Sequence, residues 1–427
     1  MVIKRSRHFI AFLVVCCLAH RSSAQTDKLT LDECYRLARA NYPAIKKMNL
    51  ITRASAYDIQ NANKRFLPQV NFSGQATYQS QTVNFSDAVG TLPGVSFPSV
   101  SKDQYRVQGE VSQLLYDGNN TRYQKELITA DKDLQEQNLE TGLYAIKNRI
   151  NNIYFSVLLM EAQLKQNELN KANLQTQVQK TEAALENGTA FRSSLDELKA
   201  EIVNIEMAGT EYRANRIACL KMLSLFIGKE LQDSIQLEIP ETTNIQTSIN
   251  RPELKLYDLQ RSVYDVQRKQ LRSGYLPQVS AFLQGAYGRP TLNIIDNKFG
   301  PWYVAGLKFN WSLGSLYSLA NKKNMLILNQ RSVDTDRETF LLNTRLDLTQ
   351  QDEQVKKFTE LIQQDEEAIA LRAAVTRSAE AQLNNGVITI HEYIQKVNAE
   401  HLARQNELLH KIQLLQARYN QKFISGN

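Results

Sequence analysis

The side chains that could carry out chemistry in this 427-residue chain are few and widely separated. His391, His401 and His410 follow one another at intervals of ten and nine residues within one predicted helix. This spacing does not bring any two of them onto one helix face at the separation that metal ligands need. The sequence contains no glycine-rich phosphate loop and no serine or cysteine in a recognisable nucleophile motif. The residues therefore predict no catalytic, cofactor or metal site, and they argue against an enzyme.

Four cysteines raise a second possible chemistry. Cys34 and Cys219 each lie in an apolar-periodic helical context, which is typical of buried thiols. A disulfide between them stays open in an oxidising compartment, although one pair is no disulfide framework in a chain this long. Cys16 and Cys17 lie in an N-terminal leader, and neither follows the small residue that lipid attachment needs.

The leader has the order of a secretory signal peptide. Basic residues precede an apolar run at 9–19, and Ser22-Ser23-Ala24 then offers small residues for cleavage. We expect residues 1–24 to be removed, because the apolar run is too short for a membrane-spanning helix. The formal charge of the chain is +7, and four positive charges belong to the leader, which leaves 7 − 4 = +3. This small balance gives no support to nucleic-acid binding.

Two copies of one plan follow the leader. Three signatures occur twice and in the same order: Asn-x-Pro at 41–43 and 250–252, Leu-Pro-Gln-Val at 67–70 and 276–279, and Asn-Gly at 187–188 and 385–386. Such duplication indicates an internal repeat. We predict repeat 1 at 25–240 and repeat 2 at 241–427.

Proline placement separates two kinds of structure within each repeat. All nine prolines fall within 43–98 or 240–301. The long proline-free stretches have apolar residues at three- and four-residue steps, which predicts very long packed helices. An Asn-Gly pair interrupts each stretch and can end a helix. We therefore predict an antiparallel helical hairpin at 119–231 with its tip near 187–190, and another at 315–424 with its tip near 385–388.

Each Leu-Pro-Gln-Val signature is followed by a change of period from helical to two. Val70 and Phe72, for example, alternate with Gln69 and Asn71. Apolar and polar faces that alternate in this way over about ten residues are typical of transmembrane β-strands. The tryptophans Trp302 and Trp311 could mark two aromatic girdles or could pack within a sheet. Four strands are predicted, at about 68–80, 103–116, 277–288 and 302–313.

Four strands cannot close a barrel, and lipid offers no hydrogen bonds to an open edge. Two copies would give eight strands around a filled interior, whereas three would give twelve around an aqueous lumen. The polar strand faces include Arg106, Glu110 and Lys308, which suit water better than a filled interior. The sequence therefore favours a homotrimer.

Taken together, these motifs resemble the TolC type of outer-membrane efflux protein over essentially the whole mature chain. Besides the duplicated signatures, the resemblance includes Leu29–Cys34, Leu115-Tyr116-Asp117-Gly118 and Trp311-Ser312-Leu313-Gly314. It implies a mainly α fold with membrane β-structure, in which long antiparallel helical hairpins form an α-barrel joined to a 12-stranded β-barrel shared by a trimer.

The resemblance also implies a function and partners. The chain would be a passive duct in the lipid of the bacterial outer membrane, with its helical tube in the periplasm. It would serve a tripartite efflux or type I secretion system and would meet an inner-membrane transporter through a periplasmic adaptor protein. Small molecules or polypeptides would be the cargo, which the sequence leaves open along with the identity of the transporter and adaptor.

Two sets of site residues follow from the same resemblance. The tips would contact the adaptor through Asn187, Gly188, Ser194, Asp196, Asn385 and Gly386. Acidic residues shortly after the second tip would narrow the closed end of the pore. Glu392 holds the first such position, and Gln395 stands where a second acid is expected, which weakens a cation gate. Alternatively, Glu392 is a solvated charge in the first turn of a helix, where acids suit the helix dipole.

A different class of protein shares part of this pattern. A periplasmic coiled-coil adaptor, or a structural protein without a pore, would also have long helical hairpins. It would not need four alternating strands at corresponding places in two repeats. The strands therefore decide between a duct and these alternatives.

Overall fold

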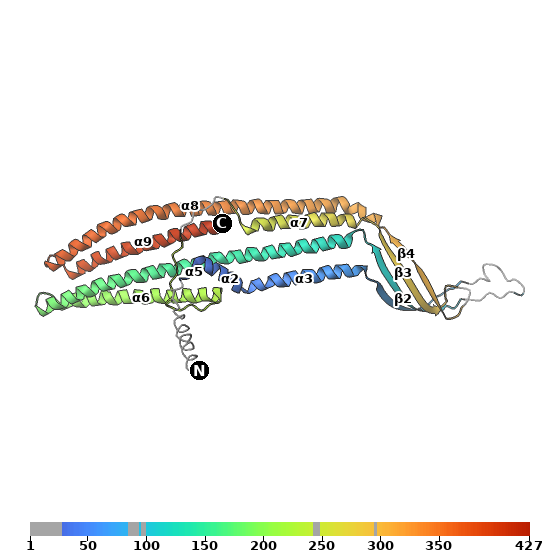
Figure 1. Cartoon of the computed structure of the whole chain (residues 1–427), viewed down its shortest axis with the longest axis horizontal. Coiled ribbons are helices and arrows are strands. Elements are labelled where there is room, and N and C mark those ends of the chain that lie inside the picture. Colours follow the sequence, from blue (N-terminus) through green and yellow to red (C-terminus); the bar gives the residue numbers. More distant parts are fainter. Residues whose placement is uncertain (1–27, 84–93, 95–99, 242–247, 294–296) are drawn as a thin grey trace, which may run out of the picture. The chain divides into compact units, whose positions relative to one another are not determined.

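The computed structural model describes residues 28–83, 94, 100–241, 248–293 and 297–427, so the expected signal peptide lies outside the described residues. Figure 1 gives the elements in chain order. The chain forms two compact units. The first consists of Met1–Ile45, Gly142–Arg251 and Asn343–Asn427, and the second consists of Lys46–Thr141 and Pro252–Leu342.

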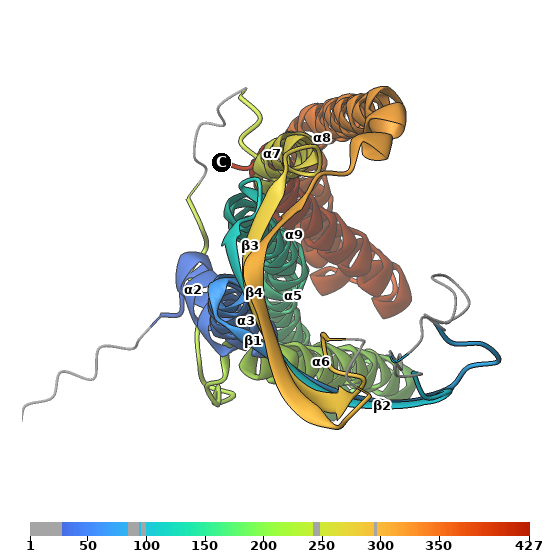
Figure 2. The ribbon, with the colours of Figure 1, turned by 90° about the vertical axis from the view of Figure 1, so that its right-hand side faces the viewer.

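A four-stranded antiparallel sheet lies in the second unit. Its strands are β1 (Gln69–Tyr78), β2 (Asp103–Tyr116), β3 (Gln278–Arg289) and β4 (Gly300–Asn310), and they pair in the order β1-β2-β3-β4. Figure 2 shows them side by side as one curved sheet. Sequential strands therefore pair with one another, and β1 and β4 form its outer edges.

One face of this sheet is apolar from edge to edge. The register places Val70 opposite Val111, Val111 opposite Leu283, and Leu283 opposite Ala305, which makes one apolar row across all four strands. Opposite residues share a face because side chains alternate along each strand. Much of this face is open, since Phe72 is 83% exposed. An exposed face of this kind suits lipid rather than water.

The two tryptophans lie on opposite faces. Trp302 pairs with Ala286, and it is an odd number of residues from Trp311. Trp311 continues the apolar face beyond the end of β4 and donates its indole N–H to the Tyr275 carbonyl oxygen over 2.9 Å. Of the two tryptophans, only Trp311 therefore lies on the apolar face, where a girdle residue is expected.

Helices adjoin one end of every strand. They are α3 (Lys46–Asn63), α7 (Pro252–Ser273) and the first parts of α5 (Asn120–Glu186) and α8 (Leu319–Asn384), with the 3₁₀ turns η2 (Lys64–Phe66) and η3 (Leu313–Ser318). In the second unit, Ala130 of α5 packs with Val263 and Val266 of α7. Among the helices in the described parts of the chain, none has an apolar stretch long enough to cross a bilayer.

The junction between β2 and α5 is capped by a buried carboxylate. Asp117 is only 3% exposed, and its Oδ2 accepts a hydrogen bond of 2.7 Å from the Thr121 backbone N–H. This contact satisfies one of the free donors at the start of the helix. It gives the motif Tyr116-Asp117-Gly118 a local structural role.

Four helices meet in the first unit. α5 is followed by α6 (Arg192–Ile227), and α8 by α9 (Ile390–Ser425), so each pair is a hairpin. One buried apolar cluster joins all four helices. Its members are Leu174 of α5, Leu198 and Ile205 of α6, Ala379 of α8, and Ile390, Tyr393, Ile394 and Val397 of α9. The three- and four-residue spacing of these positions is that of a packed helical seam.

The duplicated Asn-x-Pro signature marks the place where each return helix ends. At the end of α2 (Leu31–Asn41), the Asn41 side chain donates to the carbonyl oxygens of Leu225 and Phe226 in the last turn of α6. Likewise, the Asn250 backbone N–H donates to the Ser425 carbonyl oxygen of α9 over 2.6 Å. Each asparagine thus satisfies carbonyls that the end of a helix leaves free.

The segment between the repeats also packs into the first unit. Leu29 and Leu237 form a parallel bridge, and the buried Tyr154 hydroxyl lies 2.7 Å from the carbonyl oxygens of Leu29 and Glu238. Both Cys34 and Cys219 are free thiols. Burial raises the pKa of the Cys34 thiol to about 12, so this thiol stays protonated and unreactive.

The predicted fold class is confirmed: the chain is mainly helical, with long antiparallel hairpins and a four-stranded sheet. The division into repeats at 240/241 stays a prediction. The two compact units do not follow that division, because each unit takes segments from both repeats.

Candidate functional site: the hairpin tips

The two hairpins end in the same backbone turn. Gly188 has φ +71° and Gly386 has φ +70°, and both lie in the left-handed region. The N–H of each glycine donates over 3.0 Å to a leucine carbonyl oxygen, that of Leu185 or Leu383. A β-carbon on either glycine would meet nothing within 4 Å. Glycine is therefore needed here for its backbone angle rather than for space.

The asparagine before each glycine ties the turn to its helix. Asn187 donates from its side chain to the Ala183 carbonyl oxygen over 2.9 Å, and Asn385 donates to that of Ala381 over 2.8 Å. The Asn-Gly signature thus supplies both the turn and its restraint. These four predicted tip residues do lie at the tips.

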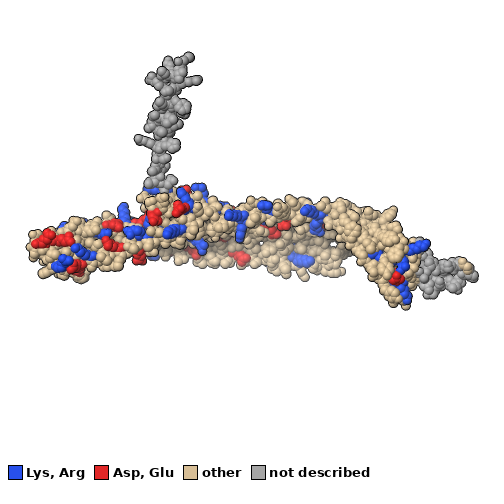
Figure 3. Space-filling model, turned by 90° about the horizontal axis from the view of Figure 1, so that it is seen from below, with Lys and Arg blue, Asp and Glu red and all other residues tan. Residues whose placement is uncertain are grey.

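The side chains beyond the turns differ between the two tips. Phe191 precedes α6 and is 79% exposed, whereas Val387 of the second tip is 70% exposed. Near Phe191, the Ser194 N–H donates to the Phe191 carbonyl oxygen, and Asp196 pairs with Arg192 over 3.3 Å. Acidic and basic side chains both gather over this end of the hairpins on the face seen in Figure 3.

The start of α9 is held by a capping box that contains Glu392. The Thr389 N–H donates to Glu392 Oε2 over 2.8 Å, and the Glu392 N–H donates to Thr389 Oγ1 over 3.2 Å. The hydrogen bond from the Thr389 backbone lowers the pKa of the Glu392 carboxyl. The predicted gate residue therefore has a structural task within its own helix. The pattern Thr-x-x-Glu at 389–392 could have revealed this task in the sequence.

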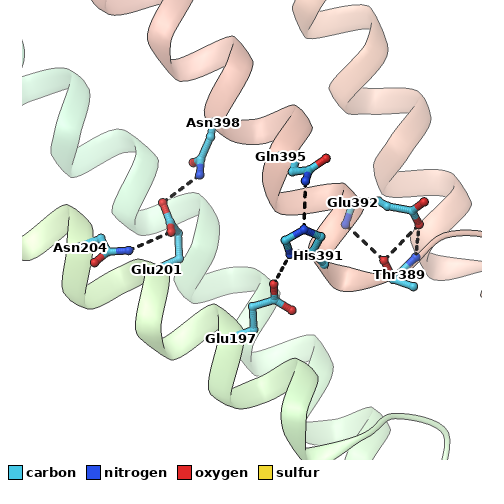
Figure 4. A network of polar contacts seen from close by, with 8 residues as sticks. All are labelled: Glu197, Glu201, Asn204, Thr389, His391, Glu392, Gln395 and Asn398. Atoms are coloured by element: carbon cyan, nitrogen blue, oxygen red, sulfur yellow. Dashed lines mark hydrogen bonds and ion pairs between the residues drawn. The ribbon is translucent and has the colours of Figure 1, made fainter.

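A second set of polar contacts connects α6 with α9 (Figure 4). His391 Nδ1 lies 2.5 Å from Glu197 Oε1, and Gln395 Nε2 lies 2.9 Å from His391 Nε2. Because an amide nitrogen donates, His391 Nε2 accepts, and its Nδ1–H donates to Glu197. Farther along the helices, Asn398 donates to Glu201 over 3.0 Å.

The structure gives Glu392 and Gln395 separate partners. Gln395 contacts His391 of its own helix, while Glu392 turns toward Thr389 (Figure 4). The two predicted gate residues are therefore not brought together within one chain. The His391–Glu197 contact was not predicted, because the two residues are 194 positions apart and no local signal joins them.

Energetically, this exposed network is secondary to the apolar cluster beneath it. The His391 and Glu197 side chains are 63% and 37% exposed. Ion pairs in such positions contribute at most about 1 kcal/mol. In contrast, Leu198 is fully buried, and removing such a side chain costs about 2–5 kcal/mol. The apolar cluster of the four helices therefore holds the hairpins together.

His401 is a half-buried polar group on the same helix. Its Nε2 lies 2.9 Å from Gln405 Nε2, and burial lowers the pKa of its imidazole, while Glu201 opposes that effect. Partial burial thus favours the neutral form of the ring. Within the described ranges, no cluster of three His, Cys, Asp or Glu side chains could hold a metal ion.

Comparison with known proteins identifies the class of protein that has these hairpin tips. The family described as outer membrane efflux protein matches residues 34–229. Crystal structures of CusC share the fold at 13% identity and a TM-score of 0.69, covering 93% of this chain and 92% of that chain. Residues 34–229 thus match the outer membrane efflux protein family, and the chain shares the fold of its solved channels.

Two further solved members have the same fold. VceC of Vibrio cholerae is 12% identical with a TM-score of 0.64, and covers 93% of this chain and 96% of its own. The open state of the Neisseria gonorrhoeae MtrE outer membrane channel is 12% identical with a TM-score of 0.65, covering 93% and 89%. No curated protein matches the sequence.

The family match and the shared fold together confirm the predicted class of function. The chain is an outer-membrane efflux channel with a helical extension in the periplasm, and the family is not enzymatic. Channels of this family are trimers. The alternatives of a coiled-coil adaptor and of a structural protein without a pore are thereby set aside.

Proposed function

We propose that this chain is one third of a passive exit duct that completes a tripartite efflux or type I secretion system. The observation that carries this proposal is the four-stranded sheet with one continuous apolar face. Such a face suits lipid, while the opposite face carries polar pairs such as Gln108 and Gln284. Export through a water-filled lumen needs both faces.

The sheet edges set the assembly. β1 and β4 are the outer strands, and their free edge groups cannot stay unpaired in lipid. Pairing β4 of one copy with β1 of the next closes a barrel of 4 × 3 = 12 strands in a trimer. This number leaves room for a lumen, whereas eight strands would be filled by side chains.

The tips are the proposed contact with a periplasmic adaptor, which in turn would meet an inner-membrane transporter. Asn187, Gly188, Ser194, Asp196, Asn385 and Gly386 are the residues assigned to this contact. Their support is positional: the two turns are hydrogen-bonded, exposed and backbone-equivalent. Phe191 and Val387 add exposed apolar area that the chain itself does not cover. The proposed gate remains Glu392, in a ring of three, with Gln395 beside His391.

The experiment uses the full chain expressed with its leader. We expect it in the outer-membrane fraction, as a heat-sensitive trimer on gels, and as a conducting pore in planar bilayers. A water-soluble monomer without conductance would overturn the duct. For the tip contact, a photo-crosslinking side chain replaces Asp196, and the control replaces Glu206, ten residues farther along α6. Capture of an adaptor at both positions, or at neither, would remove the tips from that role.

A further inference from the structure

The second unit contains a groove where the strands join the helices. Its volume is about 510 Å³, and it is lined by residues of α7, α8, η3, the turn before β3 and the first residue of α5. None of the residues that line the groove belongs to the hairpin tips. The groove lies at the helix-joined end of the sheet, because Tyr275 and Gln278 form part of its wall.

Two helices present one face each to this groove. α8 contributes Lys322, Met325, Leu326 and Asn329, and α7 contributes Gln267, Gln270 and Leu271. Residues three, four and seven positions apart share one side of a helix. The groove is thus formed by two regular helix faces rather than by a loop.

The side chains that line the groove are suited to an amphipathic ligand. Leu271, Met325 and Leu326 supply apolar surface, and Gln267 and Gln270 supply amide donors. Lys322 is the cation. Among the described residues that line the groove there is no aspartate or glutamate, and within the described ranges no acidic side chain pairs with Lys322. The lining therefore favours a negatively charged head attached to an apolar body.

The position of the groove indicates which ligand can reach it. Trp311 lies on the lipid-facing side of the sheet and donates to the Tyr275 carbonyl oxygen, and Tyr275 lines the groove. The neighbouring η3 exposes Leu313, Leu316 and Tyr317, the last of which is 92% exposed. Aromatic and aliphatic side chains in this arrangement are typical of a membrane interface. The groove therefore adjoins the membrane-facing surface at Tyr275.

We propose that this groove binds the head group of an anionic phospholipid at the periplasmic face of the outer membrane, with Lys322 on the phosphate and Met325 against the acyl chain. The proposal rests on the membrane position of the sheet and adds a lipid site to the channel. At the junction after β2 in the first repeat, Asp117 is buried as a helix cap.

The test titrates phosphatidylglycerol into the delipidated full-length trimer in detergent and counts bound lipid by native mass spectrometry. We expect Lys322→Gln to weaken binding about fivefold, the effect of one lysine near an anionic lipid surface. Lys323→Gln is the matched control, because Lys323 is exposed and adjacent but does not line the groove. An equal loss in both variants would mean diffuse attraction and would overturn the site.

Two further arms separate other occupants. Phosphatidylcholine should bind more weakly than phosphatidylglycerol, and inorganic phosphate should not displace the lipid; displacement would mean a free-phosphate site. If Lys322→Gln instead weakens the trimer and leaves lipid binding unchanged, a second copy of the chain covers the groove and the proposal fails. Pore conductance, measured on the same variants, should stay unchanged. Its absence in the wild-type trimer would count against the duct and not against the lipid site.

Discussion

The side-chain amide of Asn41 occupies the space that a β-carbon on Gly228 would need. Gly228 ends α6 with φ +68°, and Asn41 donates to the last carbonyls of the same helix. The first repeat therefore uses one glycine for two purposes, a left-handed backbone and a close approach. The equivalent Gly426 ends α9 with φ +86° against the backbone of Asn250.

Gly228→Ala should destabilise the protein more than Gly188→Ala. Both glycines have nearly the same φ, and a left-handed residue with a β-carbon costs about 1–2 kcal/mol. Only Gly228 also faces a neighbouring side chain, which adds about 1–3 kcal/mol of overpacking. The midpoints of thermal unfolding in detergent measure the difference. Equal midpoints would show that Asn41 moves aside without cost.

The two roles of Glu392 can be separated by a pair of variants. Glu392→Gln keeps an oxygen that can accept from Thr389 but removes the charge, so a charged gate predicts altered conductance and weaker block by cations. Thr389→Ala removes half of the capping box and keeps the charge, at a cost of about 1 kcal/mol in stability. Single-channel recordings should change in the first variant alone. A change only in Thr389→Ala would exclude Glu392 as a charged gate.

Stability should fall in acid because of His401. Burial lowers the pKa of its imidazole below the ordinary 6.5, so the unfolded chain takes up this proton first as the pH falls. The folded state therefore loses stability as pH falls through about 6.5, and the contribution is intact above that pH. His401→Gln should flatten the dependence of the unfolding midpoint between about pH 7 and pH 5. Parallel curves for both proteins would contradict this assignment.

The apolar cluster, rather than the ion pairs above it, should determine how firmly the hairpins are held. Leu198→Ala removes a fully buried side chain and should cost about 2–5 kcal/mol. Leu402→Ala is its control, because Leu402 on α9 is 57% exposed. Glu197→Gln should change the unfolding midpoint far less than Leu198→Ala. A larger effect of Glu197→Gln would show that the polar contacts at the tips contribute more to stability than the apolar cluster.

Sequence patterns predicted the fold well where the signal was local and repeated. The Asn-Gly turns, the proline-free helices and the alternating strands each depend on residues close together in the chain, and duplication supported every one of them. The capping box at Thr389 could also have been predicted from its local pattern, although Glu392 was interpreted as either a gate or a solvated charge.

Other features could not be predicted because they depend on distant parts of the chain. His391 meets Glu197 only when α6 and α9 are side by side. The groove near Lys322 needs α7 beside α8, and the difference between the two tryptophans became clear only from the strand register. The division into compact units likewise cuts across the repeats, because contacts follow position along the helices rather than order in the chain.

The two tip turns have the same backbone conformation, which has a consequence for any partner that binds there. A trimer offers the same backbone shape 2 × 3 = 6 times, so a six-membered partner ring would meet an equivalent scaffold at every step. The side chains next to the two turns differ, however: Thr189 and Phe191 follow one turn, and Val387 and Thr389 follow the other. A partner subunit can therefore fit every position in shape while telling neighbouring positions apart by polarity.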